Sequence, residues 1–409
     1  MLDSQTRQLV KQTAPVLKEH GVALTRHFYQ RLFAHNPELR QIFNQGHQQA
    51  GTQQQALAMA VAAYAEHIDN PGVLASALTH IASKHVSLGI RAEHYPIVGQ
   101  HLLASIREVL GEAASDALID AWAAAYGQLA DMLIAQEGQM YTQAATQRGG
   151  WSGWRGFKIQ RKVPESEEIT SFHLVPADGG PLPSYKPGQY VTVRVLVPEL
   201  GHVQPRQYSL SSAPGGHALR ISVKREASQG ALAPAGLVSN TLHDAVAEGS
   251  VIDLSPPIGV FHLHEDRDTP VVMLSAGVGI TPMVAMLDHL LQQGSARQIR
   301  FVHACRHGGV HAFREHLVNL CAEHATLRGA VFYEHPRETG EDARTGWQAG
   351  RMDLRKLADT VDTVVLPGAD YYLCGPVPFM QGQAAVLREL GVSPDRIHVE
   401  AFGSGSVAL

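Results

Sequence analysis

The sequence has 409 residues, 44% of them hydrophobic and 17% charged, and its formal net charge is −5. At ~150 residues per domain, this length suggests about two to four domains, each able to bury its own core. The negative charge gives no reason to expect nucleic acid or an anionic membrane as a partner. The three cysteines, Cys305, Cys321 and Cys374, match no zinc or disulfide spacing, which suits a reducing compartment.

The chain begins without the pattern of a signal peptide. Met1-Leu2-Asp3-Ser4 is not followed by a basic region and an apolar core, so we expect a cytoplasmic protein. The longest uncharged stretch, residues 271–287, is interrupted by two glycines and Pro282. A buried strand, a turn and a helix start explain it better than a membrane helix does. We therefore expect no stable membrane association.

Residues 3 to about 145 predict an all-helical domain. Apolar side chains recur at intervals of three and four, at Val10, Ala14, Leu17, Leu24, Phe28 and Leu32. Asn36-Pro37-Glu38 predicts the start of a further helix, with Asn36 as its cap and Pro37 in its first turn. The helical pattern continues over residues 56–64, 78–86, 95–110 and 115–141.

Residues 151 to about 262 change to a period of two. The clearest stretches are residues 157–159, 170–174, 190–195 and 219–223, which are rich in β-branched side chains. Glycine and proline clusters separate them. Many short strands spaced in this way predict a small antiparallel β-barrel.

From about Thr269 onward, apolar strands alternate with helices. Strands are expected at 271–274, 299–302, 329–332 and 370–373, and helices at 282–291, 312–321 and 378–390. This alternation predicts parallel strands in a nucleotide-binding α/β domain. The domain boundaries that we expect are 1–147, 151–264 and 267–409.

A glycine turn follows the first strand of the α/β domain. Gly277-Val278-Gly279-Ile280-Thr281-Pro282 would let the backbone come close to a diphosphate, and the next helix offers unpaired N–H groups and the positive end of its dipole. A Gly-x-Gly turn is weak support by itself, because many strand–helix turns use glycine.

The barrel region contains Arg206-Gln207-Tyr208-Ser209-Leu210-Ser211 in a strand-like stretch. Arg206 can neutralise a diphosphate, Tyr208 can lie against a flavin ring, and Ser209 can bond near the ring nitrogen that accepts hydride. An ordinary strand with a core tyrosine is the plain alternative. Residues 236–240 then open a helix expected at residues 241–245, which is a second N-terminus suited to an anion.

These motifs, followed by Cys374-Gly375-Pro376 and Glu400-Ala401-Phe402-Gly403, resemble the ferredoxin–NADP reductase superfamily over residues 151–409. The resemblance implies FAD on the barrel and NADH or NADPH on the α/β domain. The residues that it implies for the FAD site are Tyr190, Arg206, Gln207, Tyr208, Ser209, Ser239, Ala401, Phe402, Gly403 and Ser404. Residues 277–282 would take the NAD(P)H diphosphate, Glu400 would tune the flavin potential, and Cys374 would lie near the nicotinamide. The plain alternative for Cys374 is a small buried residue.

The helical domain contains a candidate heme ligand. A heme needs a neutral imidazole on a helix, an apolar slot and a distal side that controls bound gas. His85 lies at the end of an expected helix, close to a glycine stop at Gly89, and Gln53 and Leu57 share one helical face upstream. By itself, a histidine such as His85 is more often a surface or core residue than a ligand.

The joint pattern resembles the bacterial globin domains of flavohemoglobins. The residues that carry this resemblance are Tyr29, Phe43, Gln53, Leu57, His85 and Tyr95, with residues 1–3, 35–39 and 95–99. Because the reductase half follows, the whole chain resembles the flavohemoglobin family. The resemblance implies heme b, FAD and NAD(P)H as cofactors.

On the proximal side, the resemblance implies that His85 binds the iron and that its second nitrogen bonds Glu137, assisted by Tyr95. A carboxylate behind the imidazole raises its basicity and pushes electron density toward the iron. Lys84 would add positive charge and influence the redox potential. A solvated glutamate is the plain alternative for Glu137.

On the distal side, the resemblance implies that Tyr29 donates a hydrogen bond to iron-bound O2, with Gln53 near and with Leu57 and Phe43 shaping the pocket. Such an apolar pocket would also admit a lipid or an azole-type ligand, as in relatives. Two departures from the family, Ser404 and the insertion Ser228–Pro234, lie at the expected rim of the FAD site.

The resemblance implies a nitric oxide dioxygenase, in which electrons pass from NAD(P)H through FAD to heme and bound O2 oxidises NO to nitrate. One alternative is a globin that binds or senses O2 or NO and whose flavin domain keeps its iron reduced. Another is a flavin reductase in which the heme is incidental. We expect a monomer that needs no separate reductase. Arg306 would favour a ribose phosphate, but no residue past the strand at 299–302 selects between NADH and NADPH.

Overall fold

The computed structural model describes residues 2–43, 51–228, 235–336, 347–358 and 364–403. The described residues form two compact units. One contains the chain up to Arg155 together with Thr192–Arg206 and Gly403, and the other contains Gly156–Val191 and Gln207–Phe402. None of the helices in these segments is long and apolar enough to cross a membrane.

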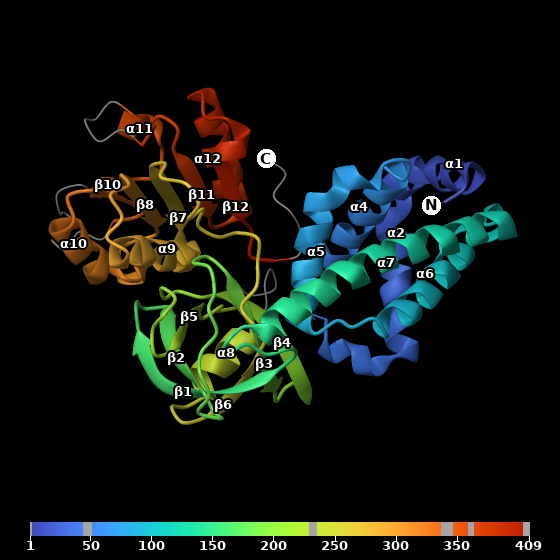
Figure 1. Cartoon of the computed structure of the whole chain (residues 1–409), viewed down its shortest axis with the longest axis horizontal. Helices are drawn as coiled ribbons and strands as arrows, with labels where there is room; N and C mark the ends of the chain where they lie inside the picture. The colour runs from blue at the N-terminus through green and yellow to red at the C-terminus, as the bar shows by residue number, and fades with distance from the viewer. Residues whose placement is uncertain (1, 44–50, 229–234, 337–346, 359–363, 404–409) are drawn as a thin grey trace. The chain divides into compact units, whose positions relative to one another are not determined.

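The first unit is helical up to residue 146, as the spacing of apolar residues predicts (Figure 1). Its elements are α1 (Ser4–Gln12), α2 (Ala14–His35), η1 (Pro37–Gln41), α4 (Thr52–Glu66), η2 (Pro71–Leu74), α5 (Ala75–Leu88), α6 (His94–Leu110), η3 (Gly111–Ala113) and α7 (Asp116–Thr146). Helix α2 packs against α4 and α6, and α5 packs against α7. The core between them buries Phe28, Leu32 and Trp122.

Asp3 and Ser115 begin α1 and α7, because their side chains accept hydrogen bonds from the backbone N–H groups of Thr6 and Leu118. The expected helix at Pro37 is instead a 3-10 turn of five residues, and Asn36 makes no capping bond. Its amide donates to Glu38 at 2.9 Å, and its oxygen lies 2.9 Å from Nε2 of His101. Asn36 thus occupies the predicted N-cap position and Pro37 the first turn, but the side chain of Asn36 makes a tertiary contact in place of the capping bond.

The antiparallel sheet has the strand order β4-β3-β6-β1-β2-β5. Its strands are β1 (Arg155–Pro164), β2 (Ile169–Pro176), β3 (Tyr190–Val197), β4 (His202–Ser209), β5 (Leu219–Lys224) and β6 (Val251–Leu254). An antiparallel bridge between Leu210, just after β4, and Ile221 of β5 joins the two edges of this sheet. The sheet therefore closes, as the short alternating strands predict.

Helix α8 (Leu237–Asp244) lies between β5 and β6 in the sequence. It begins four residues before the expected start at Thr241, because Gly236 is extended and acts as the N-cap. Ser239 therefore lies in the first turn of this helix rather than before it.

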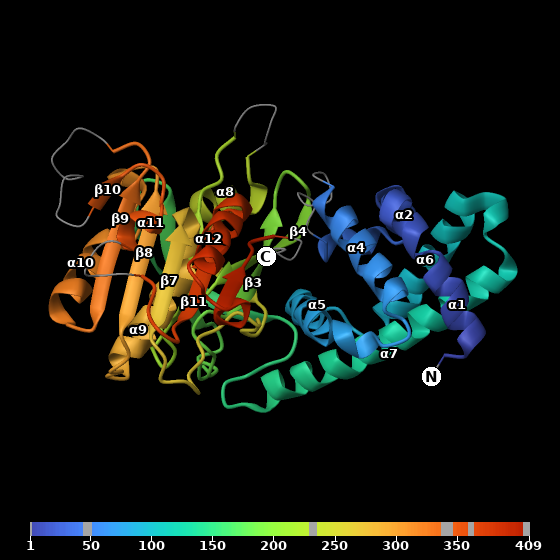
Figure 2. The ribbon, with the colours of Figure 1, turned by 90° about the horizontal axis from the view of Figure 1, so that it is seen from above.

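The second sheet is parallel, with the order β10-β9-β8-β7-β11-β12. Its strands are β7 (Val271–Ala276), β8 (Ile299–Cys305), β9 (Leu327–Tyr333), β10 (Trp347–Ala349), β11 (Asp370–Cys374) and β12 (Ile397–Glu400). Helices α9 (Ile280–Gln292) and α10 (Arg314–Glu323) cover one face, and α11 (Arg355–Ala358) and α12 (Val377–Glu389) cover the other (Figures 1 and 2).

The strand order reverses between β7 and β11. The chain leaves β7 for α9 on one face and leaves β11 for α12 on the other, so the two connections diverge at the carboxyl ends of these strands. Ligands of open α/β sheets bind at such a point. The glycine turn at Gly277 and the segment Cys374-Gly375 both lie there.

Candidate cofactor sites

His85 lies in the last turn of α5, and a glycine ends that helix as the sequence predicts. Gly89 has a φ of +76° and caps the helix, and its N–H donates to the carbonyl of Val86 at 3.1 Å. The N–H of Ile90 donates to the carbonyl of His85 at 3.0 Å. This left-handed ending suits glycine, and it fixes the backbone that carries His85.

Nδ1 of His85 lies 2.8 Å from a carboxylate oxygen of Glu137 and 3.1 Å from the hydroxyl of Tyr95. The Tyr95 hydroxyl donates to the same Glu137 oxygen at 2.5 Å. Glu137 is only 2% exposed, so the plain alternative of a solvated glutamate is wrong. Burial and the Glu137 carboxylate raise the pKa of Tyr95, and its hydroxyl therefore remains a donor.

These contacts define which nitrogen of His85 can bind a metal. Because Glu137 accepts a hydrogen bond from Nδ1, that nitrogen carries the proton. Nε2 has no hydrogen-bond partner among the described residues and is the nitrogen with a free lone pair. A neutral imidazole whose back nitrogen donates to a carboxylate is the usual arrangement of a metal-binding histidine.

Two further tyrosines support this group. The Tyr126 hydroxyl donates to the carbonyl of Tyr95 at 2.7 Å, and the Tyr141 hydroxyl donates to the carbonyl of Ile90 at 2.6 Å. Both come from α7, which also carries Glu137. These tyrosines were not predicted from the sequence, although Tyr126, Leu133, Glu137 and Tyr141 follow helical spacing along one face of α7.

The expected distal residues lie on α2, α4 and the turn after η1. Tyr29 is buried, and its ring meets Phe43 edge-on at 5.7 Å between centroids and stacks on Phe33 at 5.9 Å. Phe43 and Leu57 pack against the same hydrophobic core as Tyr29. Gln53 lies one turn before Leu57 on α4, half-buried. The structure thus brings Tyr29, Phe43 and Leu57 into one core.

Lys84, next to His85, points its ammonium at the chain beyond β12. Its Nζ donates to the carbonyl of Gly403 at 2.7 Å. This contact lies within the first unit. Ser404 and residues 229–234 of the expected insertion lie outside the described residues, and Ser228 is exposed.

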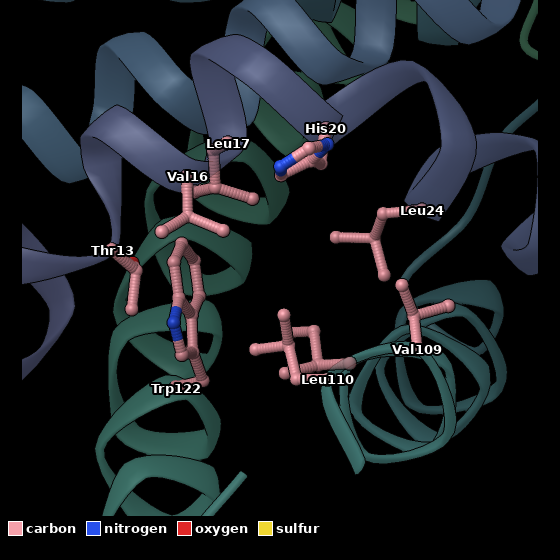
Figure 3. Close-up of a pocket in the computed structure, with 9 residues that line it drawn as sticks. Thr13, Val16, Leu17, His20, Leu24, Val109, Leu110 and Trp122 are labelled. Carbon is pink, nitrogen blue, oxygen red and sulfur yellow. The ribbon is translucent and has the colours of Figure 1, made fainter. Parts of the chain in front are cut away.

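A shallow apolar hollow in the helical unit is separate from these residues. It is lined by Thr13, Val16, Leu17, His20, Leu24, Ile106, Val109, Leu110 and Trp122 (Figure 3). None of the expected distal residues lines it. We therefore do not assign it to the heme.

The glycine turn after β7 is a 3-10 turn, Gly277–Gly279, and α9 begins directly after it at Ile280. Gly277 has a φ of +54°, and a Cβ on it would meet no atom within 4 Å. A Cβ on Gly279 would lie 2.2 Å from the carbonyl oxygen of Cys374. Gly277 thus permits the turn, whereas Gly279 permits the close approach of β11.

The side chains of Ile280, Thr281 and Pro282 are buried, so only backbone groups of this helix start can reach a ligand. Val278 is half-buried and packs against the core of the α/β part. The N-terminus of α9 therefore presents backbone N–H groups and a positive dipole end where the strand order reverses, which fits a diphosphate.

Cys374 and Glu400 lie side by side at the carboxyl ends of β11 and β12, where they are register partners. Cys374 is fully buried and Glu400 is 8% exposed. Burial and the Glu400 charge raise the pKa of the Cys374 thiol, so it is uncharged. After β12, Ala401 is half-buried and Phe402 is 47% exposed, the largest exposed aromatic side chain of the described residues and one that a flat ligand could cover.

The expected flavin residues lie on adjacent strands. Tyr190 begins β3, and its backbone exchanges two hydrogen bonds of 2.9 Å with Ile258. A Cβ on Gly259 would lie 3.0 Å from the Tyr190 ring, so this glycine makes room for the tyrosine. Arg206, Gln207 and Tyr208 are half-buried near the end of β4, and Ser209 ends it, buried.

Helix α8 carries Ser239, whose hydroxyl donates to the carbonyl of Gly236 at 3.0 Å and accepts from the N–H of Glu226 at 3.2 Å. The other end of α8 is held by Lys162 of β1. Its ammonium donates to the carbonyls of Val246, His243 and Leu242, at 2.8, 2.9 and 3.2 Å. Lys162 was not predicted from the sequence, because no local pattern marks a lysine that bonds a helix end far along the chain.

We predict that Lys162→Met loosens α8 and weakens retention of FAD. Three charge-assisted hydrogen bonds would be lost, each worth about 1.5–3 kcal/mol. Water can hydrogen-bond to the carbonyls that lose their donor, and this offsets part of the loss. A combined loss of about 2–3 kcal/mol in barrel stability is therefore expected. The check is the FAD content and dissociation constant of the full chain. Lys158→Met, on an exposed position of the same strand, is the control and should change neither value.

The residues described thus fit a heme, a flavin and a nucleotide diphosphate in distinct places. The heme would be bound by Nε2 of His85. The flavin would lie on the carboxyl-end residues of β4 with α8, and the diphosphate at the start of α9.

Comparison with known protein families identifies the domains of the chain. The globin family matches residues 26–133, and the oxidoreductase NAD-binding domain family matches residues 273–385. A flavohemoprotein of Bordetella pertussis is 64% identical over 412 aligned residues, covering 100% of both chains.

Two solved structures are also similar. The flavohemoglobin of Malassezia yamatoensis, solved with bound FAD and heme, matches 98% of this chain and 100% of its own, with a TM-score of 0.85 at 27% identity. The FAD/NAD-binding domain of a nitric oxide dioxygenase of Vibrio cholerae matches 61% of this chain and 98% of its own, with a TM-score of 0.53 at 38% identity.

Proposed function

Because the chain belongs to the flavohemoprotein family, and is therefore an NAD(P)H-dependent oxidoreductase with heme and FAD, we propose that its reaction is the dioxygenation of nitric oxide. The overall balance is 2 NO + 2 O2 + NAD(P)H giving 2 nitrate + NAD(P)+ + H+. Heme supplies O2 binding and one-electron chemistry, and FAD converts the two-electron donor into single electrons.

The observation that carries this proposal is the buried group of His85, Glu137 and Tyr95. The carboxylate accepts a hydrogen bond from the N–H of Nδ1, and this makes Nε2 a stronger electron-pair donor to a metal. Tyr95 fixes the Glu137 oxygen by a second bond, so the imidazole cannot turn away. A strongly donating ligand favours oxygen activation over reversible storage, and this supports dioxygenation above the alternative of an O2- or NO-binding globin.

We assign the remaining residues of the helical part by their position. Tyr29 would donate its hydroxyl proton toward bound oxygen, Gln53 would lie near it, and Phe43 and Leu57 would exclude water from that side. Lys84 would place a positive charge next to the His85 group. Each of these assignments is part of the proposal.

In the reductase part, we propose that Tyr190, Arg206, Gln207, Tyr208, Ser209 and Ser239 hold FAD, with Ala401, Phe402 and Gly403 beside it. Residues 277–282 would bind the nucleotide diphosphate, residues 277–281 through backbone N–H groups and Pro282 by starting the first turn of α9. Glu400 would act on the flavin potential. The three-part division at 1–147, 151–264 and 267–409 belongs to the same proposal and agrees with the change from helices to antiparallel and then parallel strands.

Arg306, the candidate for a ribose phosphate, is engaged elsewhere. Its guanidinium lies 2.5 Å from a carboxylate oxygen of Glu168. We propose NADH as the preferred donor, because NADPH would have to compete with Glu168 for this arginine. The check is the ratio of kcat/KM for the two nucleotides in the wild type and in Glu168→Gln.

The test of the proposed reaction is product analysis with the full chain loaded with heme and FAD. NO and O2 are supplied with NADH, and nitrate and NADH are measured together. Two nitrates per NADH, with NO consumption dependent on O2, would support the proposal. NO binding without nitrate formation would leave a binding or sensing globin, and NADH oxidation unaffected by NO would leave a flavin reductase.

A further inference from the structure

Arg220 of β5 holds the segment that follows the flavin motif. Its Nε donates to the Ser211 hydroxyl at 3.1 Å, and its Nη2 donates to the Ser211 carbonyl. The N–H of Ser211 in turn donates to the carbonyl of Arg220 at 2.7 Å. Ser211 lies two residues beyond Ser209, so the guanidinium is tied to the strand that carries the proposed flavin contacts.

The same guanidinium reaches the nucleotide-binding part. Nη2 lies 3.8 Å from a carboxylate oxygen of Asp288 on α9, and both side chains are less than one-fifth exposed. The other Asp288 oxygen lies 2.7 Å from Nε2 of His316 on α10. Because α9 begins at the glycine turn, Arg220 connects the flavin strand to the helix whose start would bind the nucleotide.

The ring of Phe313 also contacts the Arg220 guanidinium. The guanidinium carbon of Arg220 lies 4.9 Å from the centre of the Phe313 ring. Phe313 is 4% exposed and has a φ of +59°. Among the described residues, no other non-glycine residue has a positive φ. A bulky residue keeps such a backbone conformation only where its surroundings impose it, and such residues gather at functional places.

Apolar contacts make the two parts one packed body around Arg220. Ile169 of β2 belongs to the same buried cluster as Met273 of β7 and Met286 of α9. A Cβ on Gly188 would lie 2.5 Å from the Met286 methyl carbon, so the surfaces are in close contact there. Apolar packing has no direction, whereas the ion pair of Arg220 with Asp288, like that of Arg306 with Glu168, is directional and can favour one orientation.

We propose that Arg220 is a positioning residue for hydride transfer, because it sets the position of the flavin motif relative to α9. In this step the C4–H bond of the dihydronicotinamide breaks and an N5–H bond of the flavin forms. Two electrons and one hydrogen move together, and a solvent proton completes the reduced flavin. The rate of such a step falls steeply when donor and acceptor are misplaced by about 1 Å. The inference rests on the FAD and NAD chemistry of the family and does not depend on the reaction with NO.

The test is Arg220→Met in the full chain loaded with FAD and heme. Anaerobic stopped-flow with NADH separates the limiting rate constant of flavin reduction from the nucleotide dissociation constant. The expected limiting rate falls by ~10–100-fold, while the dissociation constant and the FAD content change little. Arg161→Met, at an exposed arginine of β1 in the same barrel, is the control and should reduce flavin at the wild-type rate.

A second readout needs no bound cofactor. Hydrogen exchange of the flavin-free full chain should show faster exchange in Arg220→Met at residues 211–212 and 308–316, and unchanged exchange elsewhere in the barrel. Arg220→Lys, which keeps the charge, should recover part of the rate. Asp288→Asn should slow reduction, and adding it to Arg220→Met should slow it no further.

Other outcomes overturn the proposal. A limiting rate of flavin reduction in Arg220→Met equal to that of the wild type would overturn it. A decrease in rate that is fully accounted for by a lower FAD content would also overturn it. If Arg220→Met does not fold, Arg220→Lys and Asp288→Asn carry the test, and wild-type rates in both would refute a positioning role. If these measurements refute a positioning role for Arg220, the proposed reaction with NO is still tested separately, by nitrate production in the wild type.

Discussion

Replacing His85 with alanine is expected to reduce NO consumption to background while leaving reduction of ferricyanide by NADH intact. His85 Nε2 is the nitrogen that would bind iron. Glu137 and Tyr95 orient the imidazole but have no side-chain nitrogen that could replace it as a ligand. The proposed flavin residues lie outside the helical part, so the bound flavin should still accept hydride from NADH. The measurements are heme content by absorbance, NO uptake with an electrode, and ferricyanide reduction.

His80→Ala is the matched control, because His80 lies on the same helix, α5. Burial lowers the pKa of His80 to about 4, so this imidazole is neutral at pH 7. Its loss should leave heme content and NO uptake near the wild-type values. NO uptake that survives His85→Ala at the wild-type rate would refute the assignment of the iron ligand.

The second large effect is expected from Asp370→Asn. The Asp370 carboxylate is fully buried at the start of β11 and accepts hydrogen bonds from Arg267 at 2.6 Å and from Thr269 at 2.5 Å. Arg396 and His398 also contact it, at 3.3 and 3.1 Å. Asp370 thereby links the segment before β7, which carries Arg267 and Thr269, to β12 and the residue before it, His398 and Arg396.

Breaking a buried ion pair costs about 3–5 kcal/mol. Because Arg267 and Arg396 keep 34% and 31% of their side chains exposed, water can partly replace Asp370, and we expect about 2–4 kcal/mol. For a unit of this size this is a fall of roughly 5–15 °C in the Tm of the reductase part. The measurement is thermal unfolding followed by flavin fluorescence. Asp395→Asn, next to Arg396 but largely exposed, should not shift the Tm.

The same carboxylate predicts a dependence on pH. Burial alone would raise the pKa of Asp370, but Thr269, His398 and Arg267 together lower it below its usual value. A folded-state pKa below the unfolded value means that stability is present above the unfolded pKa and is lost as pH falls through the folded pKa. Wild-type stability should therefore drop below about pH 4, and Asp370→Asn should flatten that part of the profile.

The sequence by itself determined most of the elements and their order. Apolar spacing predicted the helices up to residue 146, Gly89 predicted the end of α5, and continuous apolar runs predicted strands β7, β8, β9 and β11 of the parallel sheet. The short strands β10 and β12 were not predicted. These signals are local, because helix caps and alternating burial depend on residues a few positions apart. The resemblance carried by scattered motif residues gave the family, which the comparisons confirmed.

Only the tertiary structure decided how side chains from distant elements meet. Glu137 lies on a helix whose outer face also carries carboxylates, so periodicity could not decide between a buried and a solvated group. Its burial follows from α5 and α6, which bring His85 and Tyr95 to the same oxygen.

The same holds where the predictions were wrong or incomplete. Asn36 looked like a helix cap, but a contact with His101, far along the chain, takes its side chain. Arg220 and Asp370 follow no motif, since each gains its partners only when separate strands and helices pack together. Local propensity acts over a few residues, whereas such contacts form only after the chain has closed long loops, and no short pattern in the sequence records them.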